Sequence, residues 1–345
     1  MFTRESKIAV IGAGAIGGIT AGFIARAGYD IELVCKYPDL AAKIKHNGVH
    51  IFGAKGDFTV PIPAVAKIPE LSGKKDIILL ATKATEMLEA AQDLLPFLKE
   101  TSVVVSLQNG ICEDALAEIV GRERTIGCVV GWGATMHAPG ELEMTSTGEF
   151  VIGNIDYNDD SRLPFIQEIL STVVPVEISK NITGYLYSKL IINSCINSLG
   201  ALCGLTLGEM LSVKKIRKIF IGIMHEAIAV SDAMGLKVEV YAGKLDYYKF
   251  LKDENILNNI RRHLIIYLIG FKYRKIKSSS LQSLDRGKTT EIDYLNGYIA
   301  EKGKRMGIPT PINDRIIQII KDIEAGKRKI STENFKDSFF SSGRF

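Results

Sequence analysis

The sequence Lys7-Ile-Ala-Val-Ile11 runs directly into Gly12-Ala-Gly14-Ala-Ile-Gly17 near the start of the chain. A short, continuous apolar run of this kind is typical of a parallel strand that is buried on both faces. Residues 19–27 then have the apolar spacing of a helix. A strand, the pattern GxGxxG and a helix in this order form the dinucleotide-binding fingerprint. This part of the sequence therefore predicts an α/β domain that binds a dinucleotide.

Each glycine of this turn has its own task in such a domain. Gly12 allows the tight turn, Gly14 lets a pyrophosphate approach the backbone, and Gly17 lets the helix pack closely on the strand. The N–H groups at the start of the helix then face the anionic diphosphate. The residues of the turn that we expect to bind the coenzyme are Gly12, Ala13, Gly14, Ala15, Ile16 and Gly17.

Lys36 follows the next expected strand, Asp30–Cys35, and bears on the choice of coenzyme. An acidic residue at this position holds the ribose 2′-OH of NAD, whereas a cation suits the 2′-phosphate of NADP. Lys36 therefore favours NADP(H). The alternative is a solvated lysine at the end of a strand.

Two further expected strands, residues 76–81 and 102–107, lead into Lys83 and Asn109. Ligands bind at the carboxyl ends of the strands in open α/β sheets. We therefore expect both side chains to contact coenzyme or substrate. For each of them, a simple turn residue is the alternative.

The pattern changes along the chain. Residues 125–153 alternate short strand-like runs with glycines, and Ala134 is expected there in a turn close to the nicotinamide ring. After about Ile178 the patterns become helical, with helices expected over 214–233, 240–252, 256–273, 280–284, 290–306 and 312–325. We expect an NADP-binding domain over 1–178, a helical substrate and catalytic domain over 179–330, and a polar, frayed tail over 331–345. The segment His263–Lys277 is expected to be a core helix with a basic end rather than a membrane-seeking one.

The stretch from Tyr185 to Gly200 is unusual among the helical patterns. Lys189, Asn193 and Asn197 recur every fourth residue, so on a helix they form one polar line on an otherwise apolar cylinder. A buried amide or ammonium group without a partner costs about 2 kcal/mol or more. The line therefore either hydrogen-bonds to neighbouring helices or binds a polar ligand.

Residues 278–297 form a second unusual stretch. Thr290 can cap a helix whose first turn carries Glu291 and Asp293, which are favourable at the positive end of a helix. Capping alone would account for these residues. In the functional interpretation, Glu291 faces Lys189 and keeps its ammonium group charged and aimed at a carbonyl oxygen.

The composition limits the class of protein. The 345 residues are 46% hydrophobic and 24% charged with a net charge of +4, which fits a globular protein with a small ligand rather than nucleic acid. The 5 cysteines form no CxxC pair and the 5 histidines form no compact ligand pattern, so we expect reduced thiols and no metal site. Because no signal peptide and no apolar run of ~20 residues is present, the expected location is the cytoplasm, away from the membrane.

The longest motifs together resemble those of one enzyme family. SKLIINSCINSLGAL spans Ser188–Leu202, LQSLDRGKTTEIDYLNG spans Leu281–Gly297, and LQNG spans Leu107–Gly110. With the N-terminal GAGAIG, they are similar to the ketopantoate reductase (2-dehydropantoate 2-reductase) family, over about residues 7–325. The resemblance implies a Rossmann-type domain followed by an all-α domain, with the site between them and NADPH as coenzyme. It also implies an oxidoreductase that reduces 2-dehydropantoate to pantoate, on the route to pantothenate and coenzyme A.

The resemblance further implies roles for particular residues. Lys189 matches the catalytic lysine, which donates a proton to the keto oxygen as hydride reaches C2, and Glu291 is expected to assist in catalysis. A fixed ammonium group suits this step because hydride addition to a ketone builds negative charge on the oxygen. The residues expected to hold the substrate are Asn109, Asn193, Asn197 and Ser279. Outside the glycine turn, the residues expected to contact the coenzyme are Lys36, Lys83, Asn109, Ala134 and Glu291. Lys36 would take the place of the family's usual arginine.

Three residues depart from the family pattern. Glu86 stands where glutamine is common, Leu207 where asparagine often precedes Gly-Glu, and Ile276 where a polar residue is usual upstream of Ser279. They leave open a second interpretation, a reductase of another branched or hydroxylated 2-oxo acid. A third interpretation, a non-catalytic nucleotide sensor, would leave the polar line without a purpose. The expected partner is a small 2-oxo acid, and the sequence leaves a homodimer open.

Overall fold

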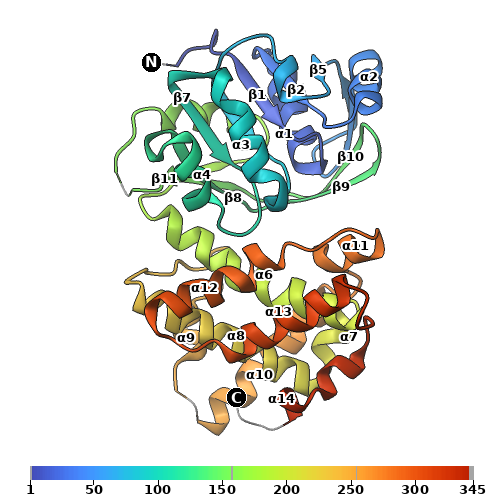
Figure 1. Cartoon of the computed structure of the whole chain (residues 1–345), viewed down its shortest axis with the longest axis vertical. Helices are drawn as coiled ribbons and strands as arrows, with labels where there is room; N and C mark the ends of the chain where they lie inside the picture. Colours follow the sequence, from blue (N-terminus) through green and yellow to red (C-terminus); the bar gives the residue numbers. More distant parts are fainter. Residues whose placement is uncertain (1, 157, 254, 342–345) are drawn as a thin grey trace. The chain divides into compact units, whose positions relative to one another are not determined.

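The computed structural model describes residues 2–156, 158–253 and 255–341. The chain divides into two compact units, Met1–Leu186 and Tyr187–Phe345 (Figure 1). The division falls inside helix α6 (Ile182–Cys203), a few residues beyond the expected boundary at 178. The first residues of α6 belong to the first unit and pack closely against Gly127 of β8 (Thr125–Val130). A Cβ on this glycine would lie 2.9 Å from Ile182 Cγ1 and 3.2 Å from Leu186 Cδ1.

An eight-stranded sheet forms the centre of the first unit (Figure 1). In sheet order its strands are β12 (Val176–Ile178), β11 (Phe150–Asn154), β8 (Thr125–Val130), β7 (Leu98–Ser106), β6 (Lys75–Leu80), β1 (Ile8–Ile11), β2 (Ile31–Val34) and β5 (Ala64–Val65). The strands from β8 to β5 pair in parallel, and β11 pairs antiparallel with β8. All four residues of β1 are buried, as expected of a strand covered on both faces.

A second sheet of the first unit packs against helix α1 (Ala15–Arg26). Its strands, in order, are β4 (Phe58–Val60), β3 (Val49–Gly53), β10 (Glu141–Ser146) and β9 (Gly133–Ala138). A Cβ on Gly18 would lie 2.5 Å from Leu142 Cδ1, and one on Gly22 would lie 2.3 Å from Ile51 Cδ1. The two glycines, one helical turn apart, therefore let α1 lie directly on this sheet. The remaining helices of the unit are α2 (Pro38–Asn47), α3 (Met87–Leu94), α4 (Glu113–Val120) and α5 (Leu163–Ser171).

The second unit is helical, which confirms the expected change from α/β to all-α structure. Its helices after α6 are α7 (Leu207–Ser212), α8 (Lys214–Ala233), α9 (Tyr247–Leu251), α10 (Ile256–Lys272), α11 (Ser279–Asp285), α12 (Asn296–Met306), α13 (Pro311–Glu324) and α14 (Ser338–Ser341). The prediction of a helix over 240–252 is wrong for its first half. Tyr241 and Leu245 pair there as a β-bridge around Gly243, and α9 begins only after its N-cap, Asp246.

Helix α10 is not the core helix that the sequence suggested. One side is buried: a Cβ on Gly270 would lie 2.7 Å from Leu211 Cβ of α7. The opposite side exposes a second apolar stripe, with 78% of Leu257, 55% of Leu264 and 61% of Phe271 accessible. The expectation fails because apolar residues occupy both faces of α10 and the chain covers one of them. Among the described residues, no helix has the length and apolar character needed to cross a membrane.

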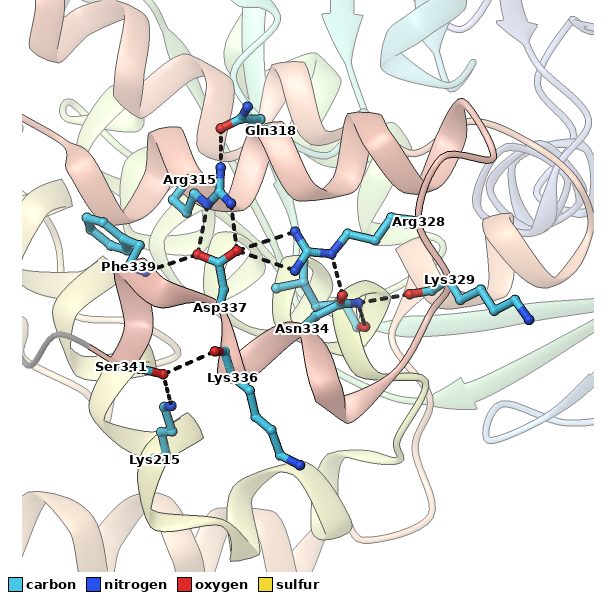
Figure 2. A network of polar contacts seen from close by, with 11 residues as sticks. Lys215, Arg315, Gln318, Arg328, Lys329, Asn334, Lys336, Asp337, Phe339 and Ser341 are labelled. Carbon is cyan, nitrogen blue, oxygen red and sulfur yellow. Dashed lines mark hydrogen bonds and ion pairs between the residues drawn. The ribbon is translucent and has the colours of Figure 1, made fainter.

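Residues 331–341 are folded, rather than being part of the frayed tail expected over 331–345 (Figure 2). Residues 342–345 of that expected tail lie outside the described residues. Asp337 accepts hydrogen bonds from Arg315 Nε at 3.0 Å and Arg315 Nη2 at 2.6 Å, and Arg328 lies on the same carboxylate. Asn334 Nδ2 donates to the carbonyl oxygen of Leu202, at the end of α6, at 2.8 Å. The Asp337 carboxylate therefore fastens this segment to α13, and the Asn334 amide fastens it to α6.

Candidate functional site

Four residues singled out from the sequence lie at one edge of the large sheet. Gly12 follows β1, Lys36 follows β2, Lys83 follows β6 and Asn109 follows β7. Because these four strands pair in parallel, their carboxyl ends share an edge. Gln108 ties two of these ends together, since its Nε2 donates to Thr82 Oγ1 at 2.9 Å. The sequence analysis quoted Gln108 only as part of a motif and gave it no role.

The glycine turn has the geometry that a diphosphate requires. Gly12 has φ +109°, and a Cβ there would lie 2.8 Å from the Ala81 carbonyl oxygen. A Cβ on Gly17 would lie 2.0 Å from the Gly12 carbonyl oxygen. Gly14, the exposed N-cap of α1, supplies no side-chain cap, and no described atom lies within 4 Å of a Cβ placed there. The backbone N–H groups of this helix start therefore face an open approach, which suits an anion.

Lys36 is already paired with an acidic residue. Its Nζ lies 2.6 Å from Glu86 Oε1, and both side chains are partly exposed, at 53% and 39%. This hydrogen bond raises the pKa of Lys36 above its usual value. Glu86 was noted in the sequence only as a departure from a family pattern, and nothing local indicated that it would contact a residue 50 positions earlier.

Glu113 is a second residue that the sequence did not indicate. It begins α4, directly after the loop that carries Asn109, and only 2% of it is exposed. The Cys112 N–H donates to Oε2 at 2.9 Å, while Oε1 is buried without a hydrogen-bond partner among the described residues. Burial raises the pKa of this carboxyl group from 4.5 to about 7.

Ala134 does not lie in a turn. It belongs to β9, where it pairs with Met144 of β10 and packs against the core. The neighbouring Gly133 misled the prediction, because it begins this strand instead of ending one.

In the second unit, α6 confirms the expected polar line. Lys189 and Asn193 are half-buried and Asn197 is 6% exposed, while Leu190 and Cys195 on other sides of the helix are fully buried. The Asn193 amide makes no hydrogen bond with any residue that the structure describes. The two alternatives for the polar line therefore stay open, since Asn193 makes no contact of this kind while Asn197 hydrogen-bonds to a neighbouring helix.

Asn197 and Ser279, which are 82 positions apart, are in direct contact. Asn197 Oδ1 accepts hydrogen bonds from Ser279 Oγ at 3.1 Å and from Ser279 N at 3.2 Å. The approach is close because Gly200 has no side chain: a Cβ there would lie 2.5 Å from Ser278 Oγ. Ser278 in turn caps α11 by accepting from Leu281 N at 3.2 Å. These two bonds occupy Oδ1, and Nδ2 makes no hydrogen bond to the described residues.

Glu291 lies half-buried at the start of a 3₁₀ turn, Ile292–Tyr294. The preceding Thr290 is held by Glu324 of α13, whose Oε1 accepts from both the Thr290 N–H and its hydroxyl at 2.7 Å. Thr290 Oγ1 then accepts from Ile292 N at 3.3 Å. The expectation that Thr290 caps a helix over 290–306 is wrong, because the N-cap of this turn is Glu291 without a side-chain cap and α12 begins only at Asn296. The approach of Glu291 to Lys189 stays a prediction.

Comparisons with known proteins identify the family of the chain. The family model described as "Ketopantoate reductase PanE/ApbA" matches residues 8–157, and its C-terminal counterpart matches residues 181–324. A 2-dehydropantoate 2-reductase of Pyrococcus abyssi is 30% identical over 321 residues, which are 92% of this chain and 98% of that protein.

Solved structures show the same fold. A ketopantoate reductase of this family from Ralstonia eutropha superposes with a TM-score of 0.79 at 30% identity, over 93% of this chain and 99% of the other. A D-mandelate dehydrogenase solved with NADH and anilino(oxo)acetate has a TM-score of 0.78 at 24% identity, again over 93% and 99%, and shares the fold. On the two matching family models and these relatives, the chain belongs to the ketopantoate reductase family.

Proposed function

We propose that this protein is an NADPH-dependent 2-dehydropantoate 2-reductase, which makes pantoate in the cytoplasm on the route to pantothenate and coenzyme A. The Asn197–Ser279 contact carries the proposal, because it joins two expected substrate ligands in one polar line with Lys189 and Asn193. The relatives named for this reaction support it.

A bound NADPH would supply the hydride that adds to C2 of the keto acid. The turn from Gly12 to Gly17 would hold its diphosphate at the helix start. Lys36 would meet the 2′-phosphate, and Lys83 and Asn109 would contact the coenzyme from the neighbouring strand ends. The coenzyme contacts expected of Ala134 and Glu291 belong to the same proposal.

Lys189 is the proton donor in this proposal. Its ammonium group gives a proton to the carbonyl oxygen as the C2–H bond forms, so the ketone becomes a secondary alcohol. Glu291 would keep the lysine charged. Asn193, the Nδ2 of Asn197 and the Ser279 hydroxyl would hold the hydroxyl and carboxylate groups of the substrate.

One observation favours a different 2-oxo acid as the alternative substrate. Two of the residues that depart from the family pattern touch each other, since Leu207 N donates to the Ile276 carbonyl oxygen at 2.8 Å. This contact lies three residues before Ser279 in the sequence. Both departures thus lie beside the segment that leads to Ser279, and this placement supports a substrate other than 2-dehydropantoate.

The test is NADPH oxidation with 2-dehydropantoate and a panel of other 2-oxo acids, with Lys189→Ala as the blank. Lysine-dependent turnover that is fastest with 2-dehydropantoate supports the proposal. Faster turnover of another branched or hydroxylated 2-oxo acid supports the alternative. NADPH binding without turnover of any of these acids would refute both.

A further inference from the structure

The Lys36–Glu86 pair stands where a Rossmann-type domain reads the ribose of its coenzyme. Lys36 follows β2 directly after Cys35, and its φ of +72° turns the chain there. Glu86 ends the short turn Ala84–Glu86 after β6. The exposed ring of Tyr37 lies beside the pair, with its centroid 5.8 Å from Lys36 Nζ. The three side chains come from one unit of the protein.

The charge of this pair differs from that of a lone lysine. At 2.6 Å the carboxylate of Glu86 offsets the ammonium charge that a 2′-phosphate would otherwise meet. A phosphate monoester carries about −1.5 to −2 charge at neutral pH. To reach Lys36 it must displace Glu86, and it then lies beside a like charge. A ribose 2′-OH faces no such penalty, because it can donate to a carboxylate oxygen of Glu86.

The exposure of the pair sets the size of the effect. With Lys36 53% and Glu86 39% accessible, water screens the ion pair, so a phosphate can open it. The pair therefore reduces the preference for the 2′-phosphate without excluding it.

We propose that Glu86 is a coenzyme-selecting residue, which pairs with Lys36 and so lets this protein bind NADH alongside NADPH. The inference rests on the nicotinamide-coenzyme function proposed above. It concerns binding alone, so it can be tested without knowing the 2-oxo acid.

The experiment measures the dissociation constants of NADPH and NADH by titration calorimetry on the full chain. Glu86→Gln removes the charge at the pair, and Glu89→Gln is the matched control. Glu89 is exposed one turn further along; its charge also raises the pKa of Lys36 but it makes no hydrogen bond to that residue, so this variant controls for a nearby charge without the contact. We expect Glu86→Gln to lower the dissociation constant of NADPH by about tenfold and to change that of NADH by less than about threefold. The control variant should change both dissociation constants by less than Glu86→Gln does. In Lys36→Gln, adding Glu86→Gln should help NADPH less, because only the repulsion between Glu86 and the 2′-phosphate is then removed.

The outcomes separate the two proposals. Circular dichroism and the melting temperature first establish that each variant is folded. If both dinucleotides bind but Glu86→Gln leaves the ratio of their dissociation constants unchanged, the role of Glu86 is refuted and the proposed function stands. If neither dinucleotide binds the unaltered protein, both proposals fail. A gain for NADPH that disappears at high salt would agree with a charge effect.

Discussion

Replacing Glu113 with glutamine should remove a pH dependence of stability that this one carboxyl group creates. Burial raises its pKa from 4.5 to about 7, so the folded protein holds a proton that the unfolded chain releases. The contribution is fully present below the unfolded pKa and is lost as the pH rises through about 7. Each pH unit between the two pKa values is worth about 1.4 kcal/mol, so the full effect is about 3 kcal/mol.

Most of this difference falls between about pH 5 and about pH 8, where we expect the wild-type protein to lose about 2.5 kcal/mol that Glu113→Gln keeps. For a unit of this size that corresponds to a relative shift in melting temperature of about 5–10 °C. Thermal unfolding followed by circular dichroism across this range measures it. Glu118→Gln, which removes an exposed carboxylate on the same helix, is the control. Parallel melting profiles for wild type and Glu113→Gln would refute the reasoning.

Three further variants test the second unit. Lys189→Ala should lower kcat by about 10²–10⁴-fold while the NADPH dissociation constant stays within a few fold, and equal losses of both would contradict a proton-donor role. Asn197→Ala breaks the 3.1 Å contact with Ser279. We expect KM for the 2-oxo acid to rise by about 10- to 100-fold while the protein stays folded. An unchanged KM would show that neither residue binds the substrate. Asp337→Asn leaves the Arg315 guanidinium without its carboxylate partner. It should lower the free energy of unfolding, measured in urea, by about 3 kcal/mol. A loss below about 0.5 kcal/mol would show that this pair does not anchor the segment in Figure 2.

Features set by neighbouring residues could be predicted from the sequence. The turn from Gly12 to Gly17 is one, because the positive φ of Gly12 and the contact of Gly17 with the Gly12 carbonyl oxygen arise within a few residues. The polar line on α6 is another, because helical spacing alone places Lys189, Asn193 and Asn197 on one side. Parallel strands likewise carry their end residues to one edge whatever surrounds them.

Pairings between distant segments and the burial of single groups were decided only by the tertiary structure. The Lys36–Glu86 pair joins residues 50 positions apart, and the Asn197–Ser279 contact joins residues 82 positions apart. Only packing placed Glu113 in the interior and made the charges around Asp337 a half-buried ion-pair cluster. Composition and periodicity record which residues are polar or apolar and how they are spaced. Which charge meets which, and which group loses its water, depends on segments that the fold brings together from far apart in the chain.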